Sequence, residues 1–162
     1  MTRRSRKAFF ETEPGAPAPL QWDVRRRVRF SEVDPLGIAW HGRYAGFFEE
    51  ASAELGRRCG LSYRDFHDAG LYAPIVQLHI DYFQPLRLDE EFTIRGRLLW
   101  CEGARLNSEY DLIKADGALA ARGYTVQLFT LADSGLPCAV VPPLLAACRR
   151  SWLAGEFKAL QA

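Results

Sequence analysis

Apolar and polar residues alternate along five stretches of the chain, and this period of two predicts β-strands. The first stretch runs from Trp22 to Phe30 and has an arginine-rich opposite face; the other four follow Pro74. Turn-forming sequences separate those four, and an Ala-Asp-Gly turn at 115–117 predicts that the last two form a hairpin. Within each of the four, the apolar residues share one parity: Val76, Leu78, Ile80 and Tyr82; Phe92, Ile94 and Leu98; Leu106, Tyr110 and Leu112; Tyr124, Val126 and Leu128.

Between residues 44 and 58 the period changes to 3.6 residues, which predicts a long helix with one apolar stripe. The stripe consists of Tyr44, Phe47, Phe48, Ala51 and Leu55. Gly60 supplies a stop signal. A shorter helix is expected over 62–70, where a serine stands three positions before an aspartate, and a terminal helix is expected to open at Pro142 and Pro143.

The predicted order is strand, long helix, short helix, four strands and helix, which favours an α+β fold with an antiparallel sheet. One apolar face of that sheet, of about five strands, would wrap around the helix of residues 44–58. Residues 1–20 contain prolines interleaved with Gly and Ala and predict a flexible N-terminal leader. Residues 21–162 are of the right length for a single domain.

Composition argues against several classes of protein. Hydrophobic residues make up 48% of the chain, enough for a packed core. The 21 Lys and Arg residues nearly balance 20 Asp and Glu, so the basic excess typical of nucleic-acid-binding proteins is missing. No apolar run approaches the roughly 18–20 residues that span a bilayer, and no signal-peptide segment follows the basic start. We expect a cytoplasmic protein without nucleic-acid or membrane partners.

The cysteines and histidines are not spaced as metal ligands. They contain no CxxC pair and no HxxxH or HExxH spacing, so neither a metal site nor a disulfide is expected. The residues concerned are Cys59, Cys101, Cys138 and Cys148, and His41, His67 and His79. The thiols are expected to pack as small apolar groups.

The densest group of unusual residues lies between the first strand and the long helix: Asp34, Pro35, Gly37, Trp40, His41 and Gly42. A type I turn alone explains the Asp-Pro-x-Gly sequence, and Trp40 alone fits a core position. A second interpretation uses the unpaired N–H groups that open a helix, near His41 and Gly42, as donors to a carbonyl oxygen. Asp34 beside them would act as nucleophile or general base. Thioester cleavage is feasible with one carboxylate and these main-chain donors, because a thiolate is a good leaving group.

At these residues the sequence resembles a known family. The segment RVRFSEVDPLGIAWHGRYAGFFEE (27–50) is similar to the opening of hotdog-fold acyl-CoA thioesterases, both the 4-hydroxybenzoyl-CoA thioesterase type and those associated with the Tol–Pal system. The segment IVQLHIDYFQPLRLDEEFTI (75–94) resembles that family's second strand and following turn. The resemblance covers roughly residues 22–150. The matching positions are Asp34, Gly37, Trp40, His41 and Tyr44, then Asp81, Tyr82, Pro85, Leu88 and Asp89.

The resemblance implies a hotdog fold that hydrolyses an acyl-CoA, or an acyl group on a carrier protein, with no cofactor besides the substrate's own coenzyme A. It makes Asp34 the catalytic carboxylate and the N–H of His41 the donor to the thioester oxygen, with the His41 side chain in a secondary role. The expected substrate-binding residues are Gly37, Trp40, Gly42, Tyr44 and His79. The family forms dimers joined edge to edge, often paired into tetramers, so a homodimer or homotetramer is expected. Trp40 is typical of aromatic-acyl members and His41 of aliphatic-acyl members, which leaves the acyl group open.

Several alternatives remain at this point. Glu49 and Glu50 lie off the apolar stripe, and a solvated helix face explains them more simply than catalysis does. Sequence offers no way to choose which surface arginines meet the CoA phosphates; Arg87, Arg105 and Arg122 are candidates. A hotdog hydroxyacyl dehydratase is a second possible function, although its histidine motif is missing. A non-catalytic acyl-binding or assembly module is a third.

Overall fold

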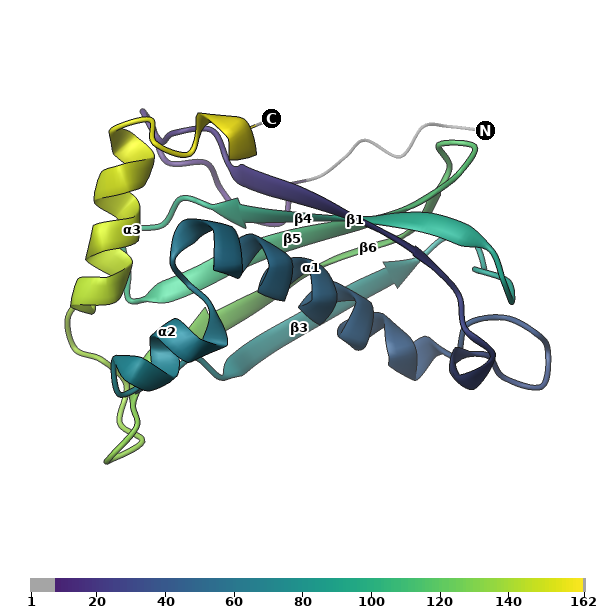
Figure 1. The fold of residues 1–162 in the computed structure, drawn as a ribbon, viewed down its shortest axis with the longest axis horizontal. Coiled ribbons are helices and arrows are strands. Elements are labelled where there is room, and N and C mark those ends of the chain that lie inside the picture. The colour runs from purple at the N-terminus through teal and green to yellow at the C-terminus, as the bar shows by residue number, and fades with distance from the viewer. Residues whose placement is uncertain (1–7, 162) are drawn as a thin grey trace.

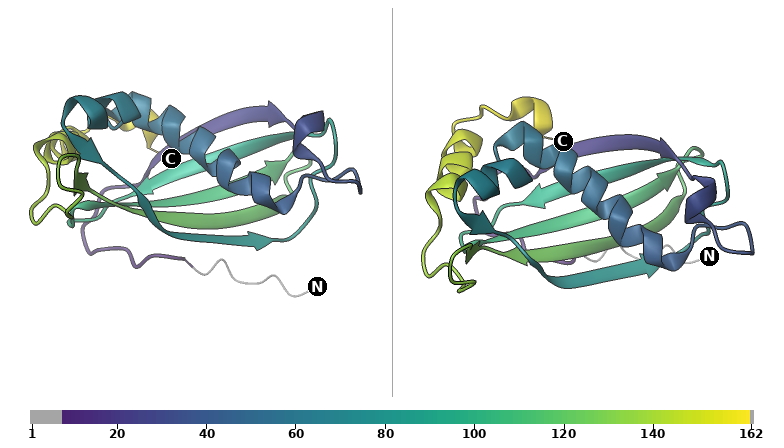
Figure 2. Two further views of the ribbon diagram at one scale, coloured as in Figure 1. Left: turned by 90° about the horizontal axis from the view of Figure 1, so that it is seen from below. Right: turned by 60° about the horizontal axis from the view of Figure 1, so that its bottom comes forward.

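The computed structural model describes residues 8–161 as an antiparallel sheet that curves around one long helix (Figures 1 and 2). The five strands lie in the order β1-β4-β5-β6-β3, and helix α1 (Tyr44–Cys59) crosses the inner face. Their bounds are β1 (Leu20–Arg27), β3 (Ile75–Tyr82), β4 (Glu91–Leu99), β5 (Arg105–Lys114) and β6 (Leu119–Leu128). The predicted α+β fold and the predicted hairpin, which is β5–β6, are therefore confirmed.

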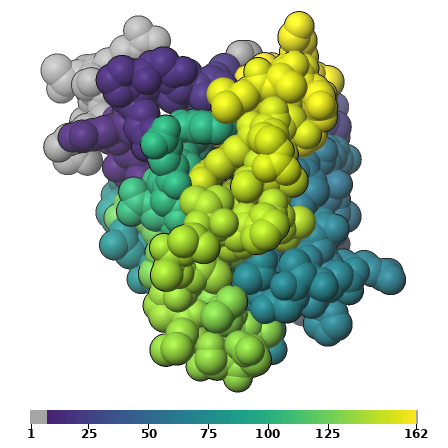
Figure 3. Space-filling view, turned by 90° about the vertical axis from the view of Figure 1, so that its left-hand side faces the viewer, coloured from purple at the N-terminus to yellow at the C-terminus, as the bar shows by residue number. Residues whose placement is uncertain are grey.

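Smaller elements close the two ends of the sheet. They are α2 (Tyr63–Asp68), α3 (Pro143–Leu153), the two-residue strands β2 (Leu71–Tyr72) and β7 (Thr130–Leu131), and the 3₁₀ turns η1 (Phe30–Glu32), η2 (His41–Arg43) and η3 (Lys158–Leu160). The predicted caps are present: the Ser62 hydroxyl accepts from the N–H of Asp65, and α3 opens with a proline. Figure 3 shows α3 in yellow beside the teal region of α2.

Helix α1 buries the predicted apolar stripe on the inner face of the sheet. Each residue of that stripe is at most 4% exposed. Phe48 stacks on Tyr110 of β5, with ring centroids 4.4 Å apart and nearly parallel planes. Burial of one such side chain contributes about 1.5–3 kcal/mol. This packing fixes α1 on the sheet, and it therefore also fixes the position in space of the first turn of α1.

Two local predictions were wrong. Strand β1 ends at Arg27, and Phe30 belongs to η1 with its side chain 84% exposed. In β6, Gly123 rather than its apolar neighbour Tyr124 faces α1, because the Phe48 ring packs directly on Gly123. The alternation of apolar residues identifies one face of a strand, but it does not show whether α1 or another part of the chain covers that face.

The N-terminal segment covers part of the outer face of the sheet, opposite α1 (Figure 2). The ring of Phe9 lies 5.5 Å from that of His79 and 5.0 Å from that of Tyr124, centroid to centroid. The Arg122 guanidinium lies 4.7 Å from the Phe9 ring, and Phe10 packs edge-on against Tyr124 at 5.2 Å. Of the leader expected over residues 1–20, residues 1–7 lie outside the described residues, and residues 8–19 make these contacts and others.

We expect Phe9→Ala to lower the free energy of unfolding by about 1–2 kcal/mol, because the ring loses its apolar and cation–π contacts. Urea denaturation followed by circular dichroism measures this. Phe30→Ala is the matched control, since the Phe30 ring is 84% exposed, and its effect should stay within about 0.5 kcal/mol. Equal effects of the two substitutions would show that the contacts of the Phe9 ring add no stability.

Candidate active site

The loop between β1 and η2 carries Asp34 and lies beyond the end of the sheet, next to the start of α1 (Figure 1). Its two sides pair with each other: Val33 forms a bridge with Ala39, and the N–H of Asp34 donates to the carbonyl of Ile38 at 2.9 Å. The loop is thus folded back on itself. Asp34 is held close to the residues that open the helix.

A second segment, residues 86–88, clamps this loop from outside. The N–H of Ala39 donates to the carbonyl of Leu86 at 2.7 Å, and the N–H of Leu88 donates to the carbonyl of Gly37 at 3.0 Å. Leu86 is fully buried, which anchors the clamp in the core. The position of Asp34 is therefore set by contacts distant in sequence as well as by its own turn.

Asp34 also stabilises that turn. Its Oδ1 accepts the N–H of Leu36 at 2.8 Å, and its carbonyl accepts the N–H of Gly37 at 2.9 Å. Gly37 has φ +74°, a conformation that strains other residues. The turn predicted from the sequence is present. The Asp34 side chain is half-buried, and its Oδ2 has no hydrogen-bond partner among the described residues, so one carboxylate oxygen is available for chemistry.

The start of α1 leaves main-chain donors without acceptors. Turn η2 leads directly into α1, and neither element has a side-chain cap or an acidic residue in its first turn. The N–H groups of His41 and Gly42 donate to no acceptor within residues 8–161. Such groups, at the positive end of a helix dipole, attract a developing negative charge. This is the arrangement that the sequence predicts for an oxyanion site.

Tyr82, at the end of β3, orients the peptide between His41 and Gly42. Its hydroxyl donates to the carbonyl of His41 at 3.0 Å. Partial burial raises the pKa of Tyr82, so the hydroxyl keeps its proton and remains a donor. In a trans peptide the C=O and the next N–H point in opposite directions. The bond therefore aims the Gly42 N–H away from Tyr82. Sequence reasoning placed Tyr82 in the family segment but missed this role.

Trp40 and His41 form an exposed wall beside these amides. The Trp40 ring lies against Gly42, where a Cβ would come within 2.3 Å of a ring atom, so a larger residue at 42 would displace the Trp40 ring. Trp40 is 46% exposed, and its ring centroid is 5.0 Å from that of His41. Tyr44 differs: it is 3% exposed and packs against Tyr82 at 4.8 Å, and burial raises the pKa of its hydroxyl. It supports the site from the core instead of lining it.

His79 is not brought together with Asp34 within one protomer. It lies opposite Tyr124 in the β3–β6 register, on the outer face, and its ring stacks on that of Tyr124 at 5.5 Å. Its Nε2 lies 3.1 Å from Oδ1 of Asp81. The structure thus places His79 on the outer face, opposite the face on which α1 packs, and its contact with a substrate stays a prediction.

The other charged residues that the sequence offers as candidates lie in different surroundings. Glu49 and Glu50 are both exposed, and Glu50 pairs with Arg26 at 2.6 Å. Arg122 is 9% exposed beneath the N-terminal segment, and Arg105, at the start of β5 and beside α3, donates to the Cys101 sulfur at 3.2 Å. Neither is placed to meet a substrate at Asp34.

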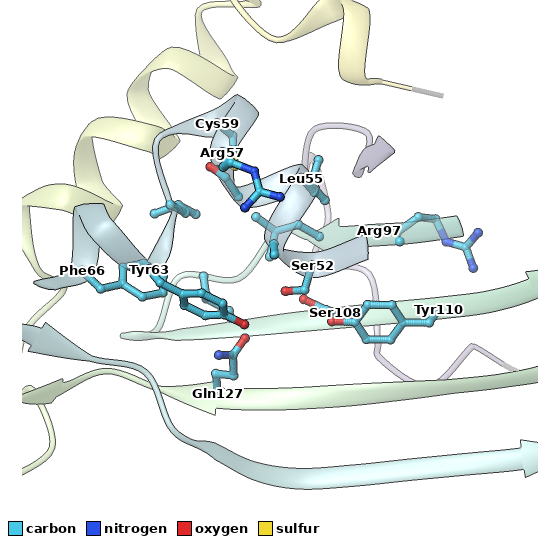
Figure 4. Close-up of a pocket in the computed structure, with 16 residues that line it drawn as sticks. Ser52, Leu55, Arg57, Cys59, Tyr63, Phe66, Arg97, Ser108, Tyr110 and Gln127 are labelled. Carbon is cyan, nitrogen blue, oxygen red and sulfur yellow. The ribbon is translucent and has the colours of Figure 1, made fainter. Parts of the chain in front are cut away.

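A small cavity lies between the second half of α1 and the sheet (Figure 4). The side chains of Ser52, Tyr63, Ser108 and Gln127 gather around it. Its volume is about 40 Å³, close to the share of one liquid water. It is too small for an acyl group and lies toward the opposite end of α1 from Asp34.

Within residues 8–161, no three or more His, Cys, Asp or Glu side chains are grouped so as to hold a metal ion. No helix in this part of the chain is long and apolar enough to cross a membrane.

The profile of the thioesterase-like superfamily matches residues 28–148, which is most of the chain. The chain belongs to this superfamily. A DHNA-CoA thioesterase structure from Staphylococcus aureus superposes with a TM-score of 0.75 at 22% identity, covering 86% of this chain and 95% of that one. The likeness confirms the hotdog fold of this thioesterase-like protein.

Curated relatives of this thioesterase-like protein are named as esterases or acyl-CoA thioesterases. It is 34% identical to a putative esterase of Aquifex aeolicus over 59% of its own length and 75% of the relative's. It is 26% identical to the putative acyl-CoA thioesterase YneP of Bacillus subtilis, over 59% of this chain and 69% of that one. The family resemblance seen at residues 27–50 and 75–94 is confirmed.

Proposed function

We propose that this protein hydrolyses acyl-CoA thioesters with Asp34 as its catalytic carboxylate. One observation carries the proposal: a carboxylate with one unengaged oxygen is clamped beside the uncapped start of α1, where the N–H groups of His41 and Gly42 have no acceptor in the described chain. The naming of relatives as esterases and acyl-CoA thioesterases supports the reaction class.

The arrangement supports a simple reaction sequence. The free amides hold the thioester carbonyl oxygen, and Asp34 takes a proton from water as the water oxygen attacks the carbonyl carbon. The tetrahedral oxyanion then collapses, the C–S bond breaks, and the proton returns from Asp34 to the sulfur, giving free acid and CoA. Direct attack by Asp34 on the carbonyl carbon, followed by hydrolysis of the anhydride, uses the same residues.

A panel of short-chain, long-chain and aromatic acyl-CoAs, assayed by release of free thiol, tests the proposed function. We expect turnover of at least one class. Binding of acyl-CoAs without thiol release from any of them would favour an acyl-binding module on the same fold.

We further propose that the protein works as a homodimer joined along β3. This strand is an edge of the sheet, and its apolar side chains Ile75, Val76, Leu78 and Tyr82 are 47–55% exposed. An edge strand with unpaired main-chain groups and apolar side chains is a ready template for pairing. Because Tyr82 also holds the start of α1, a second copy paired there would border the Asp34 site, as the family resemblance implies.

Tyr82→Phe is expected to lower kcat for thioester hydrolysis roughly tenfold with little change in KM, because the Gly42 amide loses its fixed direction. Steady-state kinetics measure this. Tyr72→Phe is the matched control, since the Tyr72 hydroxyl bonds to nothing in the described chain and the side chain is 57% exposed. An unchanged kcat in Tyr82→Phe would show that the bond to His41 has no part in turnover.

A further inference from the structure

An open hollow of about 710 Å³ lies beside β1, an outermost strand of the sheet. Its lining includes Arg25, Arg27, Arg29, Phe30 and Leu88. A second hollow, of about 550 Å³, shares Arg25 and Arg27 and continues over the outer face toward the β5–β6 hairpin. Together they form a basic surface at the same end of the sheet as Asp34.

The arginines of this surface are not fully neutralised. Arg25, Arg27 and Arg29 occupy alternate positions of extended backbone, about 6.6 Å apart and on one side. Arg27 pairs with Glu91 at 2.5 Å and lies 3.6 Å from Asp89. Arg25 and Arg29 are exposed and form no ion pair with any described residue. Two uncompensated guanidinium groups therefore flank one that is held in place.

Arg26, on the same strand, has the contacts expected of an arginine that stabilises the fold. It points inward, pairs with Glu32 and Glu50 at 2.6 Å each, and lies over the Phe47 ring at 4.8 Å. No comparable partners surround Arg25 or Arg29 in the described chain, so packing does not account for them.

Phe30 supplies a flat apolar face beside these charges. Its ring is 84% exposed and contacts no other ring or cation among the described residues. Burial in the core therefore does not explain an aromatic residue here. An exposed aromatic ring next to arginines is the combination on which nucleic-acid bases stack while their phosphates bind.

The hollow borders the loop that carries Asp34. The chain continues from the end of β1 through η1, which begins at Phe30, into that loop, and Leu88 of the lining donates its N–H to the carbonyl of Gly37. A ligand with its reactive thioester at the start of α1 and its anionic end in the hollow would lie along one end of the molecule.

Resting on the proposed function, we propose that this hollow binds the nucleotide end of coenzyme A. Arg25 and Arg29 contact the phosphates, and Phe30 stacks on the adenine. That end carries roughly four negative charges at neutral pH, with phosphates at two separate places on one nucleoside. A carrier protein presents the same pantetheine arm without this nucleotide, so the site selects CoA substrates over acyl-carrier proteins.

This assignment is tested by measuring hydrolysis of three thioesters of one acyl group, with CoA, with 3′-dephospho-CoA and with pantetheine. Arg25→Ala/Arg29→Ala should raise KM for the acyl-CoA roughly 30-fold at unchanged kcat, and Phe30→Ala should raise it several-fold. Neither variant should affect the acyl-pantetheine. Arg25→Lys/Arg29→Lys should recover part of the affinity, and Arg64→Ala, which removes an exposed arginine on α2, is the control. Adenosine 3′,5′-bisphosphate, titrated by calorimetry, should bind the unmodified chain and lose affinity for the double variant.

Several results would overturn the assignment while leaving the proposed function in place. They are equal kcat/KM of the unmodified protein on acyl-CoA and acyl-pantetheine, an unchanged KM in the double variant, and an equal loss on both substrates. Arginine-dependent hydrolysis of an acyl-carrier protein in preference to acyl-CoA would also overturn it. Conversely, arginine-dependent binding of adenosine 3′,5′-bisphosphate by a chain that hydrolyses no acyl-CoA would support the nucleotide site and refute the proposed function.

Discussion

Asp34→Asn is expected to reduce kcat for acyl-CoA hydrolysis roughly 10³-fold, because an amide neither accepts the proton of the attacking water nor attacks the thioester. The fold should be retained. The Asp34 Oδ1 accepts the N–H of Leu36, and the carbonyl oxygen of asparagine can accept that same bond. Thiol-release kinetics and thermal denaturation of the same preparations measure the two effects separately.

The chain offers a matched control for this substitution. Asp116 in the β5–β6 turn accepts the N–H of Ala118 at 2.8 Å, the same two-residue arrangement as at Asp34. Asp116→Asn should leave turnover unchanged. Asp34→Ala, which removes the turn acceptor too, should lose stability as well as activity. Turnover by Asp34→Asn close to that of the unmodified protein would remove Asp34 from the mechanism.

Leu78→Lys is expected to weaken the proposed homodimer at least 100-fold and to lower kcat/KM at least tenfold. Leu78 is 47% exposed on edge strand β3, and a lysine there would bring two copies of the same charge to a paired edge. Sedimentation velocity measures the assembly, and thiol release measures the activity of the same samples.

Leu153→Lys adds the same charge at a residue of α3 that is 63% exposed, and it should change neither quantity. If the unmodified protein sediments as a monomer, or if Leu78→Lys dimerises normally, β3 is not the interface.

Local signals were enough to predict the framework of the fold. The stripe from Tyr44 to Leu55 and the turn at Asp34 depend on residues within about one helical turn of each other, and both are present in the structure. The outward turn of Phe30 and the inward face of β6 at Gly123 depend on what packs against them. Alternation along a strand carries no information about those layers.

The candidate site, too, was predictable from the sequence only where it depends on local structure. That unpaired amides open α1 follows from the geometry of any helix, so position 41 was predictable. The contacts that set the geometry join distant positions: Tyr82 holds the carbonyl of His41, and Leu86 accepts from Ala39. The basic surface at Arg25 and Arg29 was visible only as an arginine-rich strand face, because sequence does not show which arginines lack an acidic partner.

The two edges of the sheet have opposite characters, and this limits how copies can associate. Strand β3 presents apolar side chains, whereas β1 presents arginines at 25 and 27 and is bridged at Leu20 by Gln161 of the C-terminal segment. A charged, partly covered edge resists strand addition. In the proposed homodimer joined through β3, both outermost strands would be charged and partly covered, so edge-to-edge addition of further copies would stop at two and would not continue into a filament.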